Sequence, residues 1–199
     1  SDINEAMRLK IIRAEEIGEF SWDSSLVEFN EGKGVNDFSK SDIMTLLNDL
    51  YFNMKTGTCY IGQNNKDVPC DFTLNGLHED SKKLIDSAIW YLGGNYGERN
   101  FYASDYYKFE KDKETYDCHV DDSACPRNNK WRGFVGLMYP SDYAYATDLS
   151  LCKHVGNNYF YKDREINECV DNNWLFNTKS NWVISPDITN GYNVFSIDI

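Results

Sequence analysis

Six cysteines occur as three pairs that are close together in the sequence, and this arrangement constrains the fold most strongly. Each pair lies in a polar stretch rich in Asn, Asp, Lys or Gly, whereas reduced cysteines usually lie inside apolar segments. A zinc site would need repeated Cys-x-x-Cys spacing with histidines in register, and the sequence contains none. The spacing therefore favours disulfides, and pairing of neighbours is the simplest connectivity: Cys59 with Cys70, Cys118 with Cys125, and Cys152 with Cys169.

Disulfides indicate an oxidising, extracellular compartment. The formal net charge of −12 opposes binding to nucleic acid and docking on anionic lipid, because both depend on Lys and Arg. No apolar run is long enough to span a membrane, and the first residues lack the basic and apolar regions of a secretory signal. We therefore expect a secreted or cell-surface protein whose signal or anchor would precede Ser1. The absence of Asn-x-Ser/Thr sequons favours a bacterial source.

Three segments have the apolar spacing of amphipathic helices. Ser41 is a good N-cap for a helix over 42–53, in which apolar residues recur at i, i+3, i+4 and i+7. The same spacing predicts a second helix over 79–92 and a third over 102–115. A short helical turn is expected over 143–146, after Ser141 and Asp142.

Short apolar or aromatic runs predict the strands. We expect strands at 8–17, before a turn at Gly18, and at 134–139, 182–184 and 192–197. Phe20 to Trp22 reads as another short strand or as an aromatic plug. A few early helices followed by short strands and long loops indicate an α+β class. We expect one domain over 1–199, with two to three helices packed on a small, mainly antiparallel sheet and disulfide-stapled loops.

The sequence contains no recognised catalytic motif. It lacks the Gly-x-Ser-x-Gly elbow, the phosphate-binding loop and His-Glu-x-x-His. His119 and His154 lie beside cysteines, but a Cys-His nucleophilic pair needs an unbridged thiol. We therefore expect no catalytic residues and no cofactor; a secreted hydrolase with two facing carboxylates is a further alternative.

Other side chains suggest binding rather than chemistry. Asp121, Asp122 and Asp171 could supply oxygen ligands to calcium, although EF-hand spacing is absent and solvated loop acids are the preferred interpretation. Most of the five tryptophans fit core positions. Three aromatic residues remain candidates for stacking on a glycan or another ligand: Trp174, Trp182 and Tyr143.

One block carries a family resemblance. Residues 131–146, which read Trp-Arg-Gly-Phe-Val-Gly-Leu-Met-Tyr-Pro-Ser-Asp-Tyr-Ala-Tyr-Ala, resemble a recurrent block in large surface proteins of gut Firmicutes. Further pieces similar to the same group follow in order along the chain: Ile12–Gly18, Ser21–Ser25, Gly34–Phe38, Asp42–Met44, Leu46–Asn48, Asn173–Leu175 and Trp182–Pro186. Many of these proteins resemble pilins or pseudopilins, with a hydrophobic helix before a globular head. The C-terminal pattern is also similar to C-type-lectin-like domains.

The resemblance implies a head domain without its anchor helix. Relatives of this kind continue into a strand containing Arg-Pro-Val, and this sequence ends at Ile199 before such a strand. We therefore expect a non-catalytic, structural or adhesive head of a bacterial surface or type IV pilin-like protein. Its partners would be other copies of itself, other surface subunits, or a host or bacterial glycan. A glycan- or peptide-binding lectin-like module is the alternative.

Overall fold

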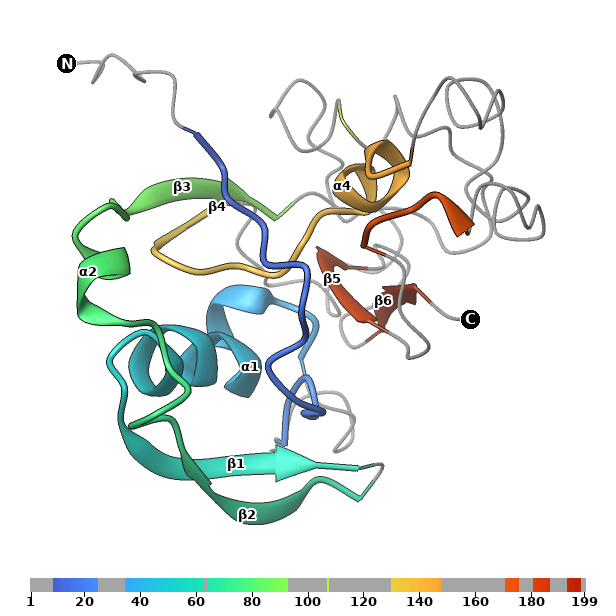
Figure 1. The fold of residues 1–199 in the computed structure, drawn as a ribbon. Helices are drawn as coiled ribbons and strands as arrows, with labels where there is room; N and C mark the ends of the chain where they lie inside the picture. Colours follow the sequence, from blue (N-terminus) through green and yellow to red (C-terminus); the bar gives the residue numbers. More distant parts are fainter. Residues whose placement is uncertain are drawn as a thin grey trace, which may run out of the picture.

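The structure is a computed structural model that describes residues 9–24, 35–62, 64–92, 107, 130–147, 171–175, 181–186 and 193–197. These residues form short helices and three two-stranded antiparallel sheets (Figure 1), which confirms the α+β class. Across these ranges no helix has both the length and the apolar character needed to cross a bilayer.

The first predicted helix is present, but it widens along its length. It begins as α1 (Asp42–Thr45), where the Ser41 hydroxyl accepts a hydrogen bond from the Met44 amide. It continues as the π-helical segment η3 (Leu46–Tyr51), which has wider i to i−5 hydrogen bonds, such as that from the Phe52 amide to the Leu47 carbonyl. A one-turn 3-10 helix, η2 (Phe38–Lys40), precedes α1. The apolar face predicted from the sequence is the face that enters the core.

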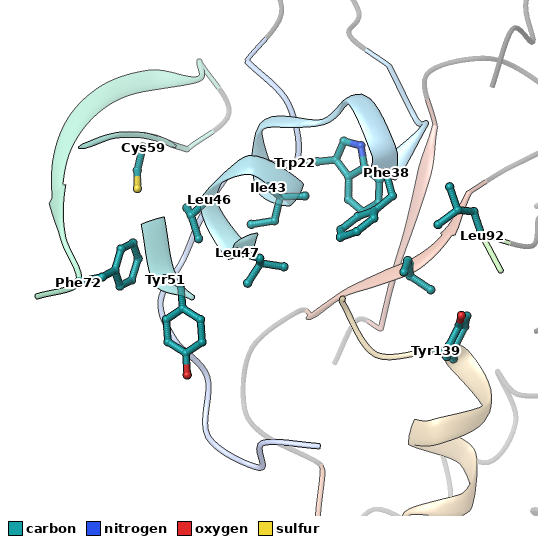
Figure 2. Packing of buried hydrophobic residues seen from close by; sticks show 11 residues of the cluster. Trp22, Phe38, Ile43, Leu46, Leu47, Tyr51, Cys59, Phe72, Leu92 and Tyr139 are labelled. Carbon is teal, nitrogen blue, oxygen red and sulfur yellow. The ribbon is translucent and has the colours of Figure 1, made fainter. Parts of the chain in front are cut away.

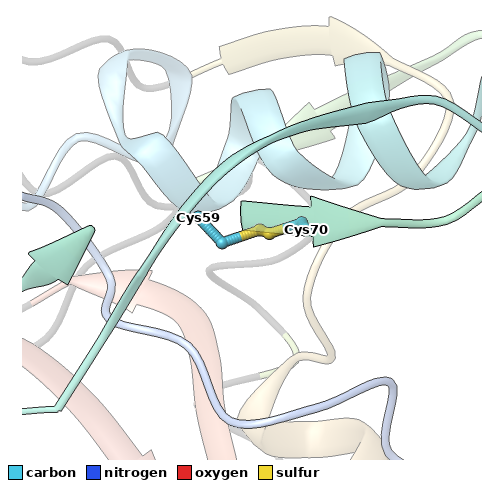
Figure 3. Close-up of a disulfide and its surroundings, with 2 residues drawn as sticks. All are labelled: Cys59 and Cys70. Atoms are coloured by element: carbon cyan, nitrogen blue, oxygen red, sulfur yellow. A yellow bond between two sulfur atoms is a disulfide. The ribbon is translucent and has the colours of Figure 1, made fainter. Parts of the chain in front are cut away.

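The first cysteine pair lies in a β-hairpin, not in the loop expected from its polar sequence. Strand β1 (Thr56–Ile61) pairs with β2 (Lys66–Asp71), and the turn between them uses positive φ angles at Gly62 and Asn65. Cys59 is bonded to Cys70, with their Cα atoms 5.7 Å apart (Figure 3). Pairing of the two strands satisfies the backbone here, and the β-branched and aromatic residues of β1 (Thr56, Thr58, Tyr60 and Ile61) favour a strand despite the polar composition around them.

The second predicted helix is wrong beyond its first turn. Helix α2 spans only Glu79–Lys82, and Ala88–Tyr91 forms strand β3, which pairs with β4 (Lys130–Gly133). Leu84, an apolar residue within the predicted helix, is 81% exposed. The Asp86 carboxylate accepts a hydrogen bond from the Ser87 amide at the point where the chain turns into β3. The aromatic and β-branched residues that follow gain more from pairing with β4 than from continuing a helix.

Two predicted strands are also wrong. Residues 9–17 form no strand, and β4 ends at Gly133, before the apolar run 134–139. In that run, the Asn48 side chain accepts hydrogen bonds from the Phe134 and Val135 amides and donates one to the Val135 carbonyl, so side-chain bonds replace strand pairing. Trp22 is buried without strand structure, which matches the aromatic-plug alternative.

The C-terminal elements agree better with the sequence. The predicted turn is helix α4 (Pro140–Tyr145), and both C-terminal strands are present as β5 (Asn181–Pro186) and β6 (Val194–Ile197). The predicted third helix, apart from Tyr107, and the other two cysteine pairs lie outside the described residues.

Aromatic side chains from distant segments form the centre of the core (Figure 2). Phe38 is fully buried and packs edge-to-face against Trp131, with ring centroids 5.1 Å apart, and against Trp22, at 6.0 Å. Trp182 meets the edge of Trp22 at 6.3 Å. These ring contacts therefore join Trp22 and the η2 helix to strands β4 and β5.

Candidate functional site

An extended segment, residues 9–20, crosses the molecule without joining a sheet; we call it the strap. Figure 1 shows the strap in dark blue, passing β3 and β4 and then running between α1 and β5. Its C-terminal end is firmly held. The Phe20 carbonyl accepts a hydrogen bond from the Trp182 indole at 2.9 Å, and the Ser21 amide donates to the Tyr60 carbonyl at 2.8 Å.

The other end of the strap is held by side chains. Lys10 forms an ion pair with Asp142 of α4, and its ammonium lies 4.7 Å from the centroid of the Tyr139 ring. The Arg13 guanidinium donates to the Tyr51 hydroxyl at 3.0 Å. Among the described residues, no backbone–backbone hydrogen bond joins the strap to the rest of the chain. Side-chain polar contacts and the packing of Ile17 and Phe20 against the core therefore help to hold the strap in place.

A groove with a volume of about 1180 Å³ follows the strap. One wall is the strap itself, and the floor is apolar, with Ile43, Leu47 and Tyr51 from the helix and Val135 and Leu137 from the segment after β4. The charged lining residues are mostly acidic: Glu15, Glu16, Glu19, Asp23 and Asp142, against Lys10 and Arg13. Five of these seven charged residues belong to the strap itself, and the other two are Asp23 and Asp142, so the lining beyond the strap is largely apolar.

The three predicted ligand-binding aromatics do not form one site. Trp182 donates a hydrogen bond from its indole to the Phe20 carbonyl and packs against Trp22, so its ring is used in the core. Tyr143 is half-buried, and this burial raises the pKa of its phenol above the ordinary value. Trp174 remains 54% exposed, on a segment tied to α4 by hydrogen bonds to the Tyr143 and Ala146 carbonyls. Of the three, Trp174 is the one that is largely exposed.

Of the residues with catalytic or metal-binding potential, His78 and Asp171 lie in the described ranges. His78 caps α2, since its Nδ1 accepts a hydrogen bond from the Asp80 amide at 3.3 Å. Asp171 is exposed, and the described ranges hold no cluster of three metal-ligating side chains. Asp121, Asp122, His119 and His154 lie outside those ranges.

Packing accounts for the conspicuous block 131–146. The Trp131 ring lies over Gly133, and a Cβ at Gly136 would approach the Trp90 ring to 2.8 Å, so neither position has room for a larger residue. The Tyr139 hydroxyl donates to the Tyr91 carbonyl at 2.9 Å. Asp142 accepts a hydrogen bond from the Tyr139 amide at the start of α4. These contacts hold the block in place, and residues 134–138 and Asp142 of the block line the groove.

Sequence reasoning missed the residues that matter most at the groove, namely Lys10, Arg13 and Asp142. Asp142 was recognised only as the start of a helical turn, and no local pattern in the sequence links it to Lys10. Comparisons with protein-family models, with curated proteins and with solved structures find no match to this chain.

Proposed function

We propose that this chain is a non-catalytic, extracellular head domain of a bacterial surface or type IV pilin-like protein, with a structural or adhesive role. The observation that carries the proposal is the Cys59–Cys70 bridge, whose first cysteine is only 2% exposed. Bridges of this kind persist in oxidising compartments and are rare where thiols are kept reduced. The bridge therefore supports a place outside the cytoplasm.

The block that resembles gut Firmicutes surface proteins supports a structural role. Its tryptophan, glycines, tyrosine and aspartate are used in packing and helix capping, as described above. Asp142 of this block lines the groove, where it forms an ion pair with Lys10 and caps α4. The use of this block favours a scaffold that presents surfaces to other subunits.

Thiol alkylation of intact cells of the source organism tests the proposal. Peptides analysed without reduction should contain Cys59 linked to Cys70, and antibodies against the folded domain should label the cells without permeabilisation. A cytoplasmic protein with both cysteines alkylated as free thiols would contradict the proposal. The linked peptide would not form if the chain folded and remained in a reducing compartment.

A glycan-binding module is the second candidate, favoured by the exposed Trp174 ring. Sugars stack on such faces, and one stacked ring contributes about 1 kcal/mol, so Trp174→Ala should weaken binding on a glycan array by roughly fivefold. Phe134→Ala, which removes an exposed aromatic residue stacked on Phe52, is the matched control and should leave binding unchanged. Equal binding by wild type and Trp174→Ala would exclude this site.

A further inference from the structure

Two segments meet at the C-terminal end of helix α4, namely residues 140–147 and residues 171–175. Thr147 and Asn173 form an antiparallel bridge between them. The Trp174 amide donates to the carbonyl of the residue that ends α4, at 3.3 Å, and the Asn173 side-chain amide donates to a carbonyl within α4, at 2.9 Å. The two segments are therefore fixed to each other by backbone and side-chain hydrogen bonds.

Each segment exposes one aromatic side chain between two buried neighbours. Trp174 is 54% exposed, whereas Asn173 and Leu175 on either side of it are buried. Tyr145 is 45% exposed and lies between two buried alanines. Because the buried neighbours fix the backbone, both rings are presented to solvent with little backbone freedom left to lose when a ligand binds.

A third exposed aromatic residue, Tyr107, supports the Tyr145 ring. Tyr107 is 41% exposed, and its ring meets the Tyr145 ring edge-to-face, with centroids 6.2 Å apart and an interplanar angle of 81°. Aromatic pairs prefer this arrangement. Tyr107 therefore helps to orient Tyr145.

The other exposed residues of these two segments are polar. They are Asp171 and Asn172, which directly precede the Asn173 anchor. Residues 140–147 and 171–175 expose no aliphatic side chain and contain no Lys or Arg. A large apolar protein interface and an anionic ligand are both disfavoured by such a surface. Aromatic rings beside a carboxamide and a carboxylate suit a neutral sugar, which offers C–H faces for stacking and hydroxyl groups for hydrogen bonds.

We infer that Trp174 and Tyr145 stack on two residues of a neutral oligosaccharide, whose hydroxyl groups are bound by Asp171 and Asn172. The Asp171 carboxylate accepts hydrogen bonds from hydroxyl groups, and the Asn172 side chain both donates and accepts them. The negative charge of Asp171, in a chain with a net charge of −12, repels acidic sugars. The inference rests on the glycan-binding candidate above and adds to it the class of sugar and the residues that join Trp174.

Titration calorimetry with four neutral tetrasaccharides tests the inference: cellotetraose, maltotetraose, mannotetraose and N-acetylchitotetraose. At least one should bind, and it should bind more tightly than its own monosaccharide because two rings take part. Tyr145→Ala and Trp174→Ala should each weaken this binding by roughly fivefold, since each removes one stacked ring. Tyr145→Phe keeps the ring and should bind as the wild type does. Phe134→Ala, an exposed aromatic residue outside these segments, should also leave binding unchanged.

An acidic sugar tests the predicted charge preference. Tetragalacturonate, which carries a carboxylate on every residue, should bind roughly tenfold more weakly than the best neutral tetrasaccharide. Asp171→Asn should narrow that difference. Tetragalacturonate binding more tightly than every neutral probe would overturn the inference.

The variants separate this inference from the functions proposed above. Binding that falls with Trp174→Ala but not with Tyr145→Ala would overturn the two-ring site and leave the glycan-binding candidate standing. No binding to any of the four neutral probes would overturn the inference and count against that candidate. Neither result bears on the extracellular location, because that proposal rests on the disulfide and is tested by thiol alkylation.

Discussion

Replacing Phe38 with alanine should lower the free energy of unfolding by about 3–5 kcal/mol. Phe38 is fully buried and its ring contacts the rings of both Trp22 and Trp131, so its removal leaves a cavity that neither indole can fill without moving. Urea denaturation followed by tryptophan fluorescence measures the loss directly. The two indoles next to the cavity make this signal sensitive to the change.

Phe134→Ala is the matched control for this substitution. Phe134 is exposed and stacks on Phe52 with ring centroids 4.4 Å apart, so its loss removes a surface contact and leaves no internal cavity. We expect a loss of roughly 1 kcal/mol, the value of one aromatic pair. If Phe38→Ala were no more damaging than Phe134→Ala, the aromatic centre of the core would be wrongly placed.

Replacing Cys59 and Cys70 together with alanine should lower the free energy of unfolding by about 3 kcal/mol. The bridge closes a loop with a sequence separation of 11 and restricts the unfolded chain more than the folded one. Alanine keeps a small apolar side chain at the buried Cys59 position, so the change reports mainly on the cross-link. Denaturation of both proteins without reductant gives the difference.

Thr58→Ala separates the loss of the bridge from general damage to the hairpin. Thr58 lies beside Cys59 on β1 and is exposed, so its replacement should change stability by less than about 0.5 kcal/mol. A double cysteine variant as stable as Thr58→Ala would mean that the bridge contributes nothing to folding. That result would also weaken the argument that links the chain to an oxidising compartment.

Local patterns predicted the elements that local interactions determine. The helix after Ser41 could be foreseen because its N-cap and its apolar face lie within a few residues of each other. The same apolar spacing after Glu79 predicted a helix that does not continue beyond its first turn, since pairing between β3 and β4 decides the structure there. β4 follows β3 only after a long stretch of chain, so no window of sequence around β3 could reveal the pairing.

The candidate site shows the same limit. The Cys59–Cys70 bridge could be predicted because its cysteines are neighbours in the sequence. The groove could not be predicted, because its strap contacts Asp142 across a separation of 132 residues. Residues 8–17 were predicted as a strand, yet within the described part of the chain no strand pairs with residues 9–17. The residue types indicated an extended segment, but they did not show which parts of the chain it contacts.

The Asn48 side-chain amide joins the two parts of the groove floor, namely the helix and the segment after β4. It donates to the Met44 and Val135 carbonyls and accepts from the Phe134 and Val135 amides, so it links η3 to the segment after β4. Leu50, on the same helix, lies so close to Gly57 of the hairpin that a Cβ there would meet its side chain at 2.6 Å. A displacement of Val135 would therefore move the helix through Asn48 and, through Leu50, the disulfide-linked hairpin as well.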